Sequence, residues 1–512
     1  MSNRVIIKAT IIVATIAFFS KVIGFFREVL IASFYGANSQ MDAYFLAHSM
    51  PSMIFPAVCN SFSTAFLSMY VKKNSIDGEK SSGKFAFNSL VFSLFLALIL
   101  SILGWLSMPY IVVLFAPGFD ESTKKLAIKL SRLIISSFIF TMSQYMFTAI
   151  LNSKKIFYAA QISGIIYNCF IIIVTVLLGK NQSVEILTLT VVFGLILQNV
   201  ILLFFIIKKG NLMRDNFVIN KDIKGILDLA IPILLGNSIV QINNIVDKMI
   251  ASNIAEGAIS AVSYSNSINS IVISIIITSL STVLYPSLVE AFAKDEKQFN
   301  NIVHRNLRLL ILVIIPISII TSIYAKDIVI VLYGRGNFSE DAVLLTTDAL
   351  FFYSFGYIFM AVREIIIRAF YAMGDSKTPM VNGTIAVFLN IIFSIIFSKY
   401  LGVGGIALAS SFANVLSSII LFYRLKSKTA DFDNTRRKDI KTFLLKLIIV
   451  YLIVILVLIV LNRYCICKID NPIFRFSTGT ILGAFMYIVV INFFSIEEWV
   501  FLKKYLKSKL NK

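Results

Sequence analysis

Long apolar runs recur along this chain, and each is long enough to cross a lipid bilayer. An α-helix rises about 1.5 Å per residue and the hydrocarbon core is about 30 Å thick, so roughly 20 apolar residues make one crossing. The runs lie near residues 9–31, 41–70, 86–115, 126–151, 157–179, 186–207, 223–251, 260–289, 309–331, 342–371, 380–398, 404–423, 442–461 and 473–496. Because backbone groups find no water inside a bilayer, this pattern predicts an all-α polytopic membrane protein with about fourteen transmembrane helices.

The composition argues against a string of soluble domains. Hydrophobic residues make up 58% of the chain and charged residues only 14%. A length of 512 residues would usually mean several globular domains, yet no Gly/Ser-rich or Pro-rich linker divides the sequence. The first apolar run is followed by Lys21, Arg27 and Glu28 rather than by a small-residue cleavage site, so we expect the first helix to be retained. One continuous membrane domain is the prediction.

The net charge of +20 has a better explanation than nucleic-acid binding. The basic residues gather in short loops between the apolar runs, and they alternate strongly in number from one side to the other. About 30 fall at the termini and in the loops that follow even-numbered runs. About nine fall in the loops that follow odd-numbered runs, and about eight lie within the runs. By the positive-inside rule, both termini are predicted to face the cytoplasm, and no nucleic-acid partner is predicted.

Internal repetition suggests two related halves. The stretch Glu28–Ser33 resembles Asp247–Ser252, and Gly164–Asn168 echoes Gly383–Asn390. Repeats of this kind build many transporters from two lobes around a central site. Chance similarity between apolar segments is the alternative. The predicted plan is two six-helix lobes in pseudo-symmetric repeat at 1–215 and 216–428, followed at 429–512 by two further helices and a basic cytoplasmic tail.

Ionisable residues inside the apolar runs are the candidate functional groups, because a charge in a bilayer is costly unless it faces water or a partner. These residues are mostly cationic: Lys21, Arg27, Glu28, Arg363, Glu364 and Arg368. A cationic interior suits an anionic substrate, since the forked donors of arginine match phosphate geometry. The alternative is that Arg27 pairs with Glu28, and Arg363 with Glu364, merely to join helices.

Asp247 is a separate candidate. This lone carboxylate lies near Asn243 and Asn244, and hard oxygen ligands of this kind could hold Na⁺ or a proton as a coupling ion. The alternative is a charge pair between Asp247 and Lys248 near the end of the helix. No other cofactor is predicted.

Enzyme motifs are sparse. His48 and His304 are the only histidines, Gly334-Arg-Gly336 has the character of a turn, and neither an HExxH motif nor a P-loop occurs. Without a nucleotide site, transport would be driven by an ion gradient, the membrane potential or a partner. A transporter rather than an enzyme is predicted.

Several motifs resemble one known family. They are Ser20-Lys-Val-Ile-Gly-Phe-Phe-Arg-Glu28, Phe34-Tyr-Gly-Ala37, Asp42-Ala-Tyr-Phe-Leu-Ala47 with Pro51, Gly257-Ala-Ile-Ser-Ala261, Leu284-Tyr-Pro-Ser-Leu288, Tyr333-Gly-Arg-Gly336 and Arg368-Ala-Phe-Tyr-Ala-Met-Gly-Asp-Ser-Lys-Thr-Pro379. Together they span nearly the whole chain. The sequence resembles the MurJ/MviN lipid II flippases of the MOP exporter superfamily.

This resemblance implies a two-lobed, fourteen-helix flippase of the bacterial cytoplasmic membrane. Such a protein carries an undecaprenyl-diphosphate-linked sugar from the inner to the outer leaflet by alternating access, and its last two helices form a groove for the lipid tail. The implied partners are this lipid-linked glycan and membrane lipids, around a monomeric protein.

The resemblance also implies roles for individual residues. Basic residues of the first helix engage the diphosphate in the family; Arg27 matches, and Lys21 stands where an arginine is usual. The positions of Glu28 and Asp42 are acidic in the family too. A sodium site of related members maps onto Asp247, Asn390 and Ser394, the last standing where a second carboxylate is usual.

Two departures leave the substrate open. Ser52–Asn60 replaces a stretch with paired arginines, and Ser265-Asn-Ser267 replaces an Ala-Asp-Arg motif. Arg363 and Arg368 are the candidates to replace the lost cations. Lipid II is the predicted substrate. The alternatives are another polyprenyl-linked glycan (of O-antigen, capsule or exopolysaccharide), a multidrug or cation antiporter of the same superfamily, a glycan polymerase or ligase, and a scaffold without transport activity.

Overall fold

The computed structural model describes residues 3–178, 183–209, 212–218, 221–429, 437–464, 466–494, 496, 498–500 and 503. Every regular element of this described part is helical. The prediction of an all-α protein is therefore confirmed. The lysines of the predicted basic tail at 504–512 lie outside the described residues.

The chain forms two compact units. Unit 1 comprises Met1–Ser260 with the short segment Gly336–Phe338, and unit 2 comprises Ala261–Arg335 and Ser339–Lys512. The seventh helix thus belongs to unit 1, although the sequence assigned it to the second lobe. The lobe boundary at 215 and the pseudo-symmetry of the lobes stay predictions.

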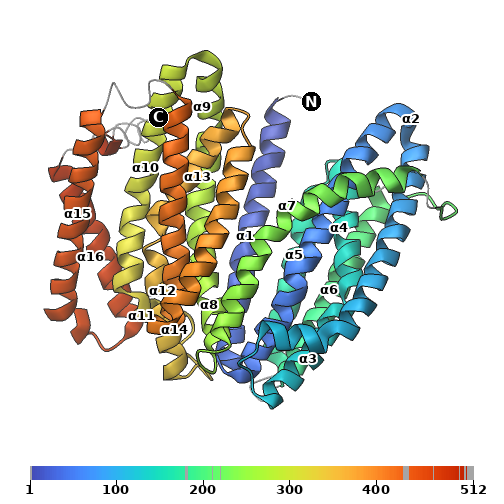
Figure 1. Cartoon of the computed structure of the whole chain (residues 1–512), viewed down its shortest axis with the longest axis horizontal. Coiled ribbons are helices and arrows are strands. Elements are labelled where there is room, and N and C mark those ends of the chain that lie inside the picture. The colour runs from blue at the N-terminus through green and yellow to red at the C-terminus, as the bar shows by residue number, and fades with distance from the viewer. Residues whose placement is uncertain are drawn as a thin grey trace. The chain divides into compact units, whose positions relative to one another are not determined.

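Seven helices build unit 1 (Figure 1). They are α1 (Asn3–Tyr35), α2 (Ser39–Phe115), α3 (Glu121–Ser136), α4 (Phe138–Ser153), α5 (Tyr158–Leu178), α6 (Val184–Lys209) and α7 (Lys221–Ala251). Helix α2 packs against α3, α4 and α7, while α1 packs against α5. Helix α1 is therefore held in place mainly by α5.

The remaining helices run from the unit boundary to the C-terminal end (Figure 1). They are α8 (Ala258–Ile271), the π-helical segment η1 (Val272–Thr278), α9 (Ser279–Lys294), α10 (Glu296–Ile323), α11 (Ala325–Leu332), α12 (Glu340–Ser354), α13 (Tyr357–Ala372), α14 (Lys377–Lys428), α15 (Arg437–Tyr464), the 3₁₀ turn η2 (Ile466–Lys468) and α16 (Pro472–Phe493). In unit 2, α13 lies against α9, α10 and α14. Helix α10 packs in addition against α12, α15 and α16, and it is the central helix of that unit.

Nine helices in the described part are long and apolar enough to cross a membrane, or ten if the bent pair α12 and α13 forms one span. Two of them, Phe55–Phe115 and Lys377–Lys428, have 61 and 52 residues. At about 1.5 Å per residue, each is more than twice the thickness of a bilayer core. Each also contains one glycine in a left-handed conformation, Gly78 or Gly402. We infer two crossings in each, and the total of fourteen spans with both termini inside stays a prediction.

Two predicted single spans contain irregularities in the structure. The run 126–151 is interrupted between α3 and α4 at Ser137, whose hydroxyl donates to the carbonyl oxygen of Ile134, yet Glu121–Ser153 still forms one candidate span. The run 342–371 is divided between α12 and α13 with a bend of 47°. Hydropathy does not detect such breaks, because both sides of each break are equally apolar.

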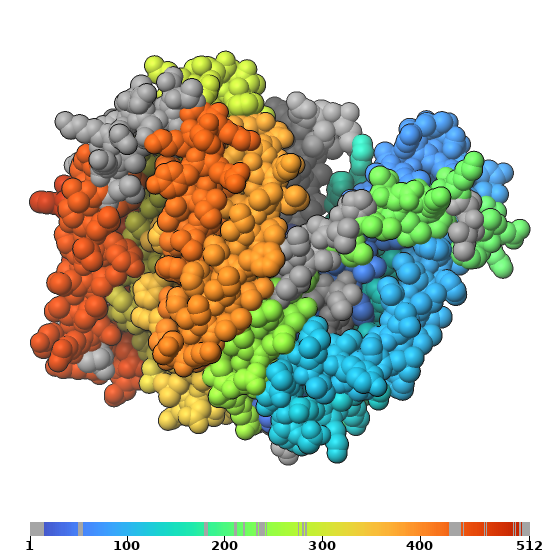
Figure 2. Space-filling view, in the orientation of Figure 1, coloured from blue at the N-terminus to red at the C-terminus, as the bar shows by residue number. Residues whose placement is uncertain are grey.

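The last two helices of the described chain pack on α10. The buried hydroxyl of Tyr487 in α16 donates to the carbonyl oxygen of Leu312 at 2.7 Å. An ion pair of 2.9 Å joins Arg308 of α10 to Glu498 beyond α16, with side chains only 11% and 8% exposed. In Figure 2 the red surface of α15 and α16 covers one edge of unit 2.

Candidate substrate and ion sites

Arg27 is the centre of a polar cluster inside unit 1. Its guanidinium donates from Nη2 to Glu28 at 2.7 Å and from Nη1 to the side-chain oxygen of Asn168 at 3.0 Å. The guanidinium carbon also lies 5.7 Å from the centre of the Tyr167 ring. The Nε atom is buried without a hydrogen-bond partner. The predicted contact between Arg27 and Glu28 exists, and one donor of the guanidinium is still unused.

Small residues bring α1 close enough to α5 for this cluster to form. A Cβ on Gly24 would lie 3.6 Å from the Asn168 amide, and a Cβ on Gly164 would lie 3.5 Å from the Ser20 hydroxyl. Asn168 in turn donates to the carbonyl oxygen of Gly164 at 2.9 Å, which fixes the side chain that receives Arg27. The motif that begins at Ser20 therefore includes the packing surface for α5.

Lys21 is placed differently from Arg27. It lies on the exposed side of α1, and no carboxylate of the described part of unit 1 pairs with it. The ion pair of Glu28 is with Arg27. A direct role for Lys21 in binding the substrate stays a prediction.

In unit 2 the predicted residues Arg363 and Arg368 lie on α13 and differ in their partners. Arg368 pairs with Glu364 at 3.0 Å and also donates to the Ser281 hydroxyl at 3.2 Å. Residues four apart share a helix face, so Glu364 and Arg368 lie side by side on α13. Glu364 therefore pairs with Arg368, and the alternative pairing of Arg363 with Glu364 is not the one observed.

Arg363 carries a charge that no carboxylate of the described residues of unit 2 neutralises. Its guanidinium donates a long hydrogen bond, 3.4 Å from Nη1 to the side-chain oxygen of Asn414. Its Nε atom is buried without a partner. Other arginines of this unit have a carboxylate close by: Arg308 has Glu498 at 2.9 Å and Arg475 has Asp327 at 2.7 Å. A half-buried cation of this kind is poised to receive an anionic ligand.

Asp42 is a buried carboxylate that holds a loop in place through hydrogen bonds. Its side chain is only 2% exposed. It accepts hydrogen bonds from the backbone amides of Gly257 and Ser260, at 2.8 and 2.7 Å, and from the Ser260 hydroxyl. These contacts hold the loop between α7 and α8 against the start of α2. The geometry favours a positioning role for Asp42, and its role in binding substrate stays a prediction.

Two glycines of the family-like motifs meet at the same end of unit 1. Both Gly36, after α1, and Gly336 have positive φ angles, 73° and 65°. Asn337 donates from its backbone amide to the carbonyl oxygen of Ser33 at 2.9 Å, and from its side chain to that of Phe34 at 2.6 Å. Motifs that lie about 300 residues apart in sequence thus form one junction.

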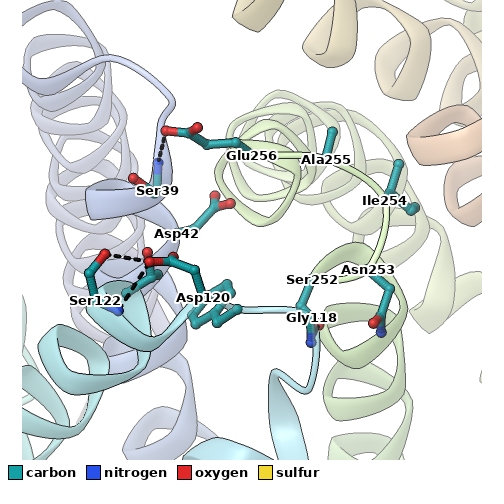
Figure 3. Close-up of a pocket in the computed structure, with 12 residues that line it drawn as sticks. Ser39, Asp42, Gly118, Asp120, Ser122, Ser252, Asn253, Ile254, Ala255 and Glu256 are labelled. Carbon is teal, nitrogen blue, oxygen red and sulfur yellow. Dashed lines mark hydrogen bonds between the residues drawn. The ribbon is translucent and has the colours of Figure 1, made fainter.

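A polar pocket of about 560 Å³ lies beside this junction within unit 1 (Figure 3). The acidic side chains of Asp42, Asp120 and Glu256 line it. Glu256 accepts a hydrogen bond from the Ser39 amide at 3.1 Å. Asp120 caps α3, and hydrogen bonds from Ser122 lower the pKa of its carboxyl group to about 2. These acids are engaged by the protein itself, so the pocket serves as part of the loop junction.

Replacing Gly336 by alanine is expected to disrupt this junction. A Cβ there would lie 2.1 Å from the carbonyl oxygen of Ser33, and the positive φ adds roughly 1–2 kcal/mol of strain. Gly374→Ala is the matched control, because Gly374 also has a positive φ, 74°, but nothing lies within 4 Å of its Cβ position. The level of folded protein in membranes should fall sharply for Gly336→Ala and little for Gly374→Ala. Equal levels would contradict the junction.

The residues of the predicted ion site fall in both units. In unit 1, Asp247 is buried and accepts from the Asn243 amide at 3.3 Å, while the Asn243 side-chain oxygen is buried without a partner. Lys248, the alternative partner of Asp247, donates to the carbonyl oxygen of Phe45 at 3.1 Å. A carboxylate beside a free carbonyl oxygen is a donor set that fits a monovalent cation.

The other half of the predicted ion site lies in unit 2. The Asn390 amide donates to the Ser410 hydroxyl at 2.9 Å, and its side-chain oxygen accepts from Ser394 at 2.8 Å. Both Asn390 and Ser394 are buried. They supply neutral oxygen atoms, so the single carboxylate of the predicted site is Asp247.

The family model described as "Lipid II flippase MurJ" matches residues 31–502 of this chain. A similar curated protein is the "Probable lipid II flippase MurJ" of Buchnera aphidicola subsp. Acyrthosiphon pisum, which is 28% identical over 96% of this chain and 98% of its own length. The "Lipid II flippase MurJ" of Burkholderia cenocepacia is 24% identical over 82% of this chain and 84% of its own length. The sequence similarity therefore covers nearly all of the chain.

Solved structures give the same result for the fold. A structure of "Lipid II flippase MurJ, inward closed conformation" matches with a TM-score of 0.78 and 27% identity, over 94% of this chain and 98% of that one. An inward-facing multidrug resistance MATE transporter of the MOP superfamily matches with a TM-score of 0.70 but only 13% identity, over 81% and 96% of the two chains. The MATE match concerns the fold alone.

Proposed function

Since the chain belongs to the lipid II flippase MurJ family, we propose that it moves lipid II from the inner to the outer leaflet of the bacterial cytoplasmic membrane by alternating access. The observation that carries this proposal is the match of residues 31–502 to the family, together with relatives aligned over nearly their full length. The protein acts as a transporter, and its partner is the undecaprenyl-diphosphate-linked precursor of peptidoglycan.

The cationic side chains support an anionic cargo. Arg27 and Arg363 each keep a buried Nε donor without a partner. Guanidinium groups with free donors suit a diphosphate, because the planar fork of N–H donors can pair with two of its acceptor oxygen atoms at once. In this proposal Arg27 receives the diphosphate in unit 1, and Arg363 supplies a further cation in unit 2. Lys21, Glu28 and Arg368 complete the polar surroundings.

In this proposal Arg363 also compensates for cations that are missing where the chain departs from the family pattern. The segments Ser52–Asn60 and Ser265–Ser267 contain no arginine, although the family resemblance leads us to expect arginines there. The un-neutralised charge of Arg363 replaces part of that lost attraction. Because any polyprenyl diphosphate would be attracted in the same way, the test must separate lipid II from other lipid-linked glycans.

Growth of a bacterial strain depleted of its own lipid II flippase provides that test. We expect this chain to restore growth and normal cell shape. A strain that lacks an O-antigen or capsule flippase should not be rescued by the same plasmid. Rescue of the second strain alone would overturn lipid II as the cargo and favour another polyprenyl-linked glycan.

Asp247 is proposed to hold the coupling cation, Na⁺ or H⁺, within unit 1, and a part for Asn390 and Ser394 of unit 2 stays a prediction. A ligand that binds only the folded state raises stability according to its concentration relative to Kd. Purified protein should therefore melt at a higher temperature in NaCl than in KCl at equal ionic strength. Asp247→Asn should abolish this difference. Identical melting of the wild type in both salts would contradict sodium binding.

A further inference from the structure

Basic residues gather on a part of unit 1 where few are expected. The side of the membrane predicted to be external holds only about nine basic residues, and Lys124 and Lys125 at the start of α3 are two of them, followed by Lys129 and Arg132 in the first turns of the predicted span 126–151. The positive-inside rule disfavours such a cluster. A cluster that runs against this bias needs a separate reason.

Three of these residues line one pocket, termed here the basic pocket. It has a volume of about 430 Å³ and is lined by Trp105, Lys125, Lys129, Arg132 and Ser136, among others. The guanidinium carbon of Arg132 lies 4.2 Å from the centre of the Trp105 ring, and its Nε donates to the Trp105 carbonyl oxygen at 3.3 Å. The stacked guanidinium keeps its Nη groups for a ligand.

Close packing of α2 on α3 builds the basic pocket. The Cβ position of Gly104 lies 2.1 Å from the terminal methyl group of Ile135, which would have to move to admit a larger residue. One turn away, the Ser101 hydroxyl donates to the Ile135 carbonyl oxygen at 3.0 Å. These two contacts fix Trp105 and Arg132 on the same pocket wall.

The basic pocket keeps a net positive charge. Glu185 pairs with Lys129 at 2.8 Å and neutralises one of the three cations. Lys125 is exposed and Arg132 has only the tryptophan contacts described above. The pocket therefore favours an anion, and the indole beside it is the side chain most enriched at membrane interfaces.

The apolar surface beside the pocket identifies the kind of ligand. Ile102, Leu103 and Leu106 of α2 are 52%, 56% and 58% exposed, which is typical of a face that contacts acyl chains. In Figure 2 the cyan surface of α3 and the adjoining part of α2 forms the lower end of unit 1. We propose that the basic pocket binds the phosphodiester headgroup of an anionic phospholipid whose chains lie along α2. An acidic protein segment would not need this apolar surface.

The two tryptophans of the chain make the proposal directly testable. In a Trp499→Phe background, Trp105 is the only fluorescent indole, and it lies in the pocket. The protein is reconstituted in phosphatidylcholine bilayers containing phosphatidylglycerol, with bromine on the chains of one lipid or the other. Each basic residue near an anionic lipid strengthens association by roughly fivefold. We expect brominated phosphatidylglycerol to quench Trp105 about fivefold or more in excess of its share of the lipid.

Matched variants locate the effect. Lys125→Gln with Lys129→Gln leaves the Arg132 and Trp105 pair intact and should remove most of the preference, and adding Arg132→Gln should remove the rest. Lys124→Gln is the control, because Lys124 lies on the same helix but does not line the pocket. Inorganic phosphate without anionic lipid should leave the fluorescence unchanged.

Three results would overturn the proposal: equal quenching by both brominated lipids, a preference that survives the triple substitution, or equal loss in Lys124→Gln. The quenching measurement does not require the protein to move lipid II. A failure of the lipid-binding proposal is therefore distinguishable from a failure of the proposed function.

Discussion

An Arg27→Ala variant is expected to lose the ability to support growth of a strain depleted of its own lipid II flippase. The substitution removes the guanidinium that contacts Asn168 and Glu28, and with it the unused Nε donor. The diphosphate would lose its main cation in unit 1. Lys72→Ala is the control, because Lys72 lies on an exposed stretch of α2 outside the predicted spans, and it should support growth normally. Colony counts with membrane protein levels as reference measure both.

A second variant separates substrate binding from helix joining. Arg27→Ala leaves Glu28 without its partner, so a loss of growth could reflect misfolding. Arg27→Gln combined with Glu28→Gln keeps polar side chains on α1 and leaves no unpaired charge. This double variant should reach normal levels in the membrane and still fail to support growth. Growth of the double variant would mean that the pair only joins helices.

Arg363→Met is expected to stabilise the protein and abolish its transport. No carboxylate of the described unit 2 pairs with Arg363, so the substitution breaks no ion pair and removes the cost of a half-buried charge, a gain on the order of 1 kcal/mol. Arg308→Met is the opposite case. It leaves Glu498 buried and unpaired, which costs about 3–5 kcal/mol. The melting temperature of purified protein should rise for the first variant and fall for the second.

The growth assay completes this comparison. A gain in stability with a loss of function is the mark of a residue kept for its ligand rather than for the fold. If Arg363→Met melted lower than the wild type, or supported growth as well as the wild type does, Arg363 would have no place in the substrate path.

Most of the fold was predictable because hydrophobicity decides it. Runs of about 20 apolar residues can only be helices in a bilayer, and charged loops mark where the helices end. The loop predicted between residues 70 and 86 is the exception: it is helical on both sides of Gly78, since its lysines and glutamate are compatible with helix in water. The breaks at Ser137 and between α12 and α13 were not predictable, because they depend on packing rather than on composition.

The candidate site was predictable only as a list of residue types. Charged residues in apolar runs drew attention to Arg27 and Arg363, whose Nε atoms are buried without a partner, and their role in binding substrate stays a prediction. Their partners depend on three-dimensional contacts: Asn168 lies 141 positions from Arg27, and Glu364 turns toward Arg368. The basic pocket was missed, although Trp105 and the spacing of Lys125, Lys129 and Arg132 on one helix face were a usable signal.

The most direct test is movement of lipid II itself. Purified protein is reconstituted in vesicles with labelled lipid II, and the label accessible to an external membrane-impermeant reagent is followed over time. We predict that the wild type makes lipid II from the inner leaflet accessible, and that vesicles with Arg27→Gln and Glu28→Gln resemble protein-free vesicles. Lipid II that stays inaccessible with the folded wild type, while another polyprenyl-diphosphate-linked glycan crosses, would contradict the account.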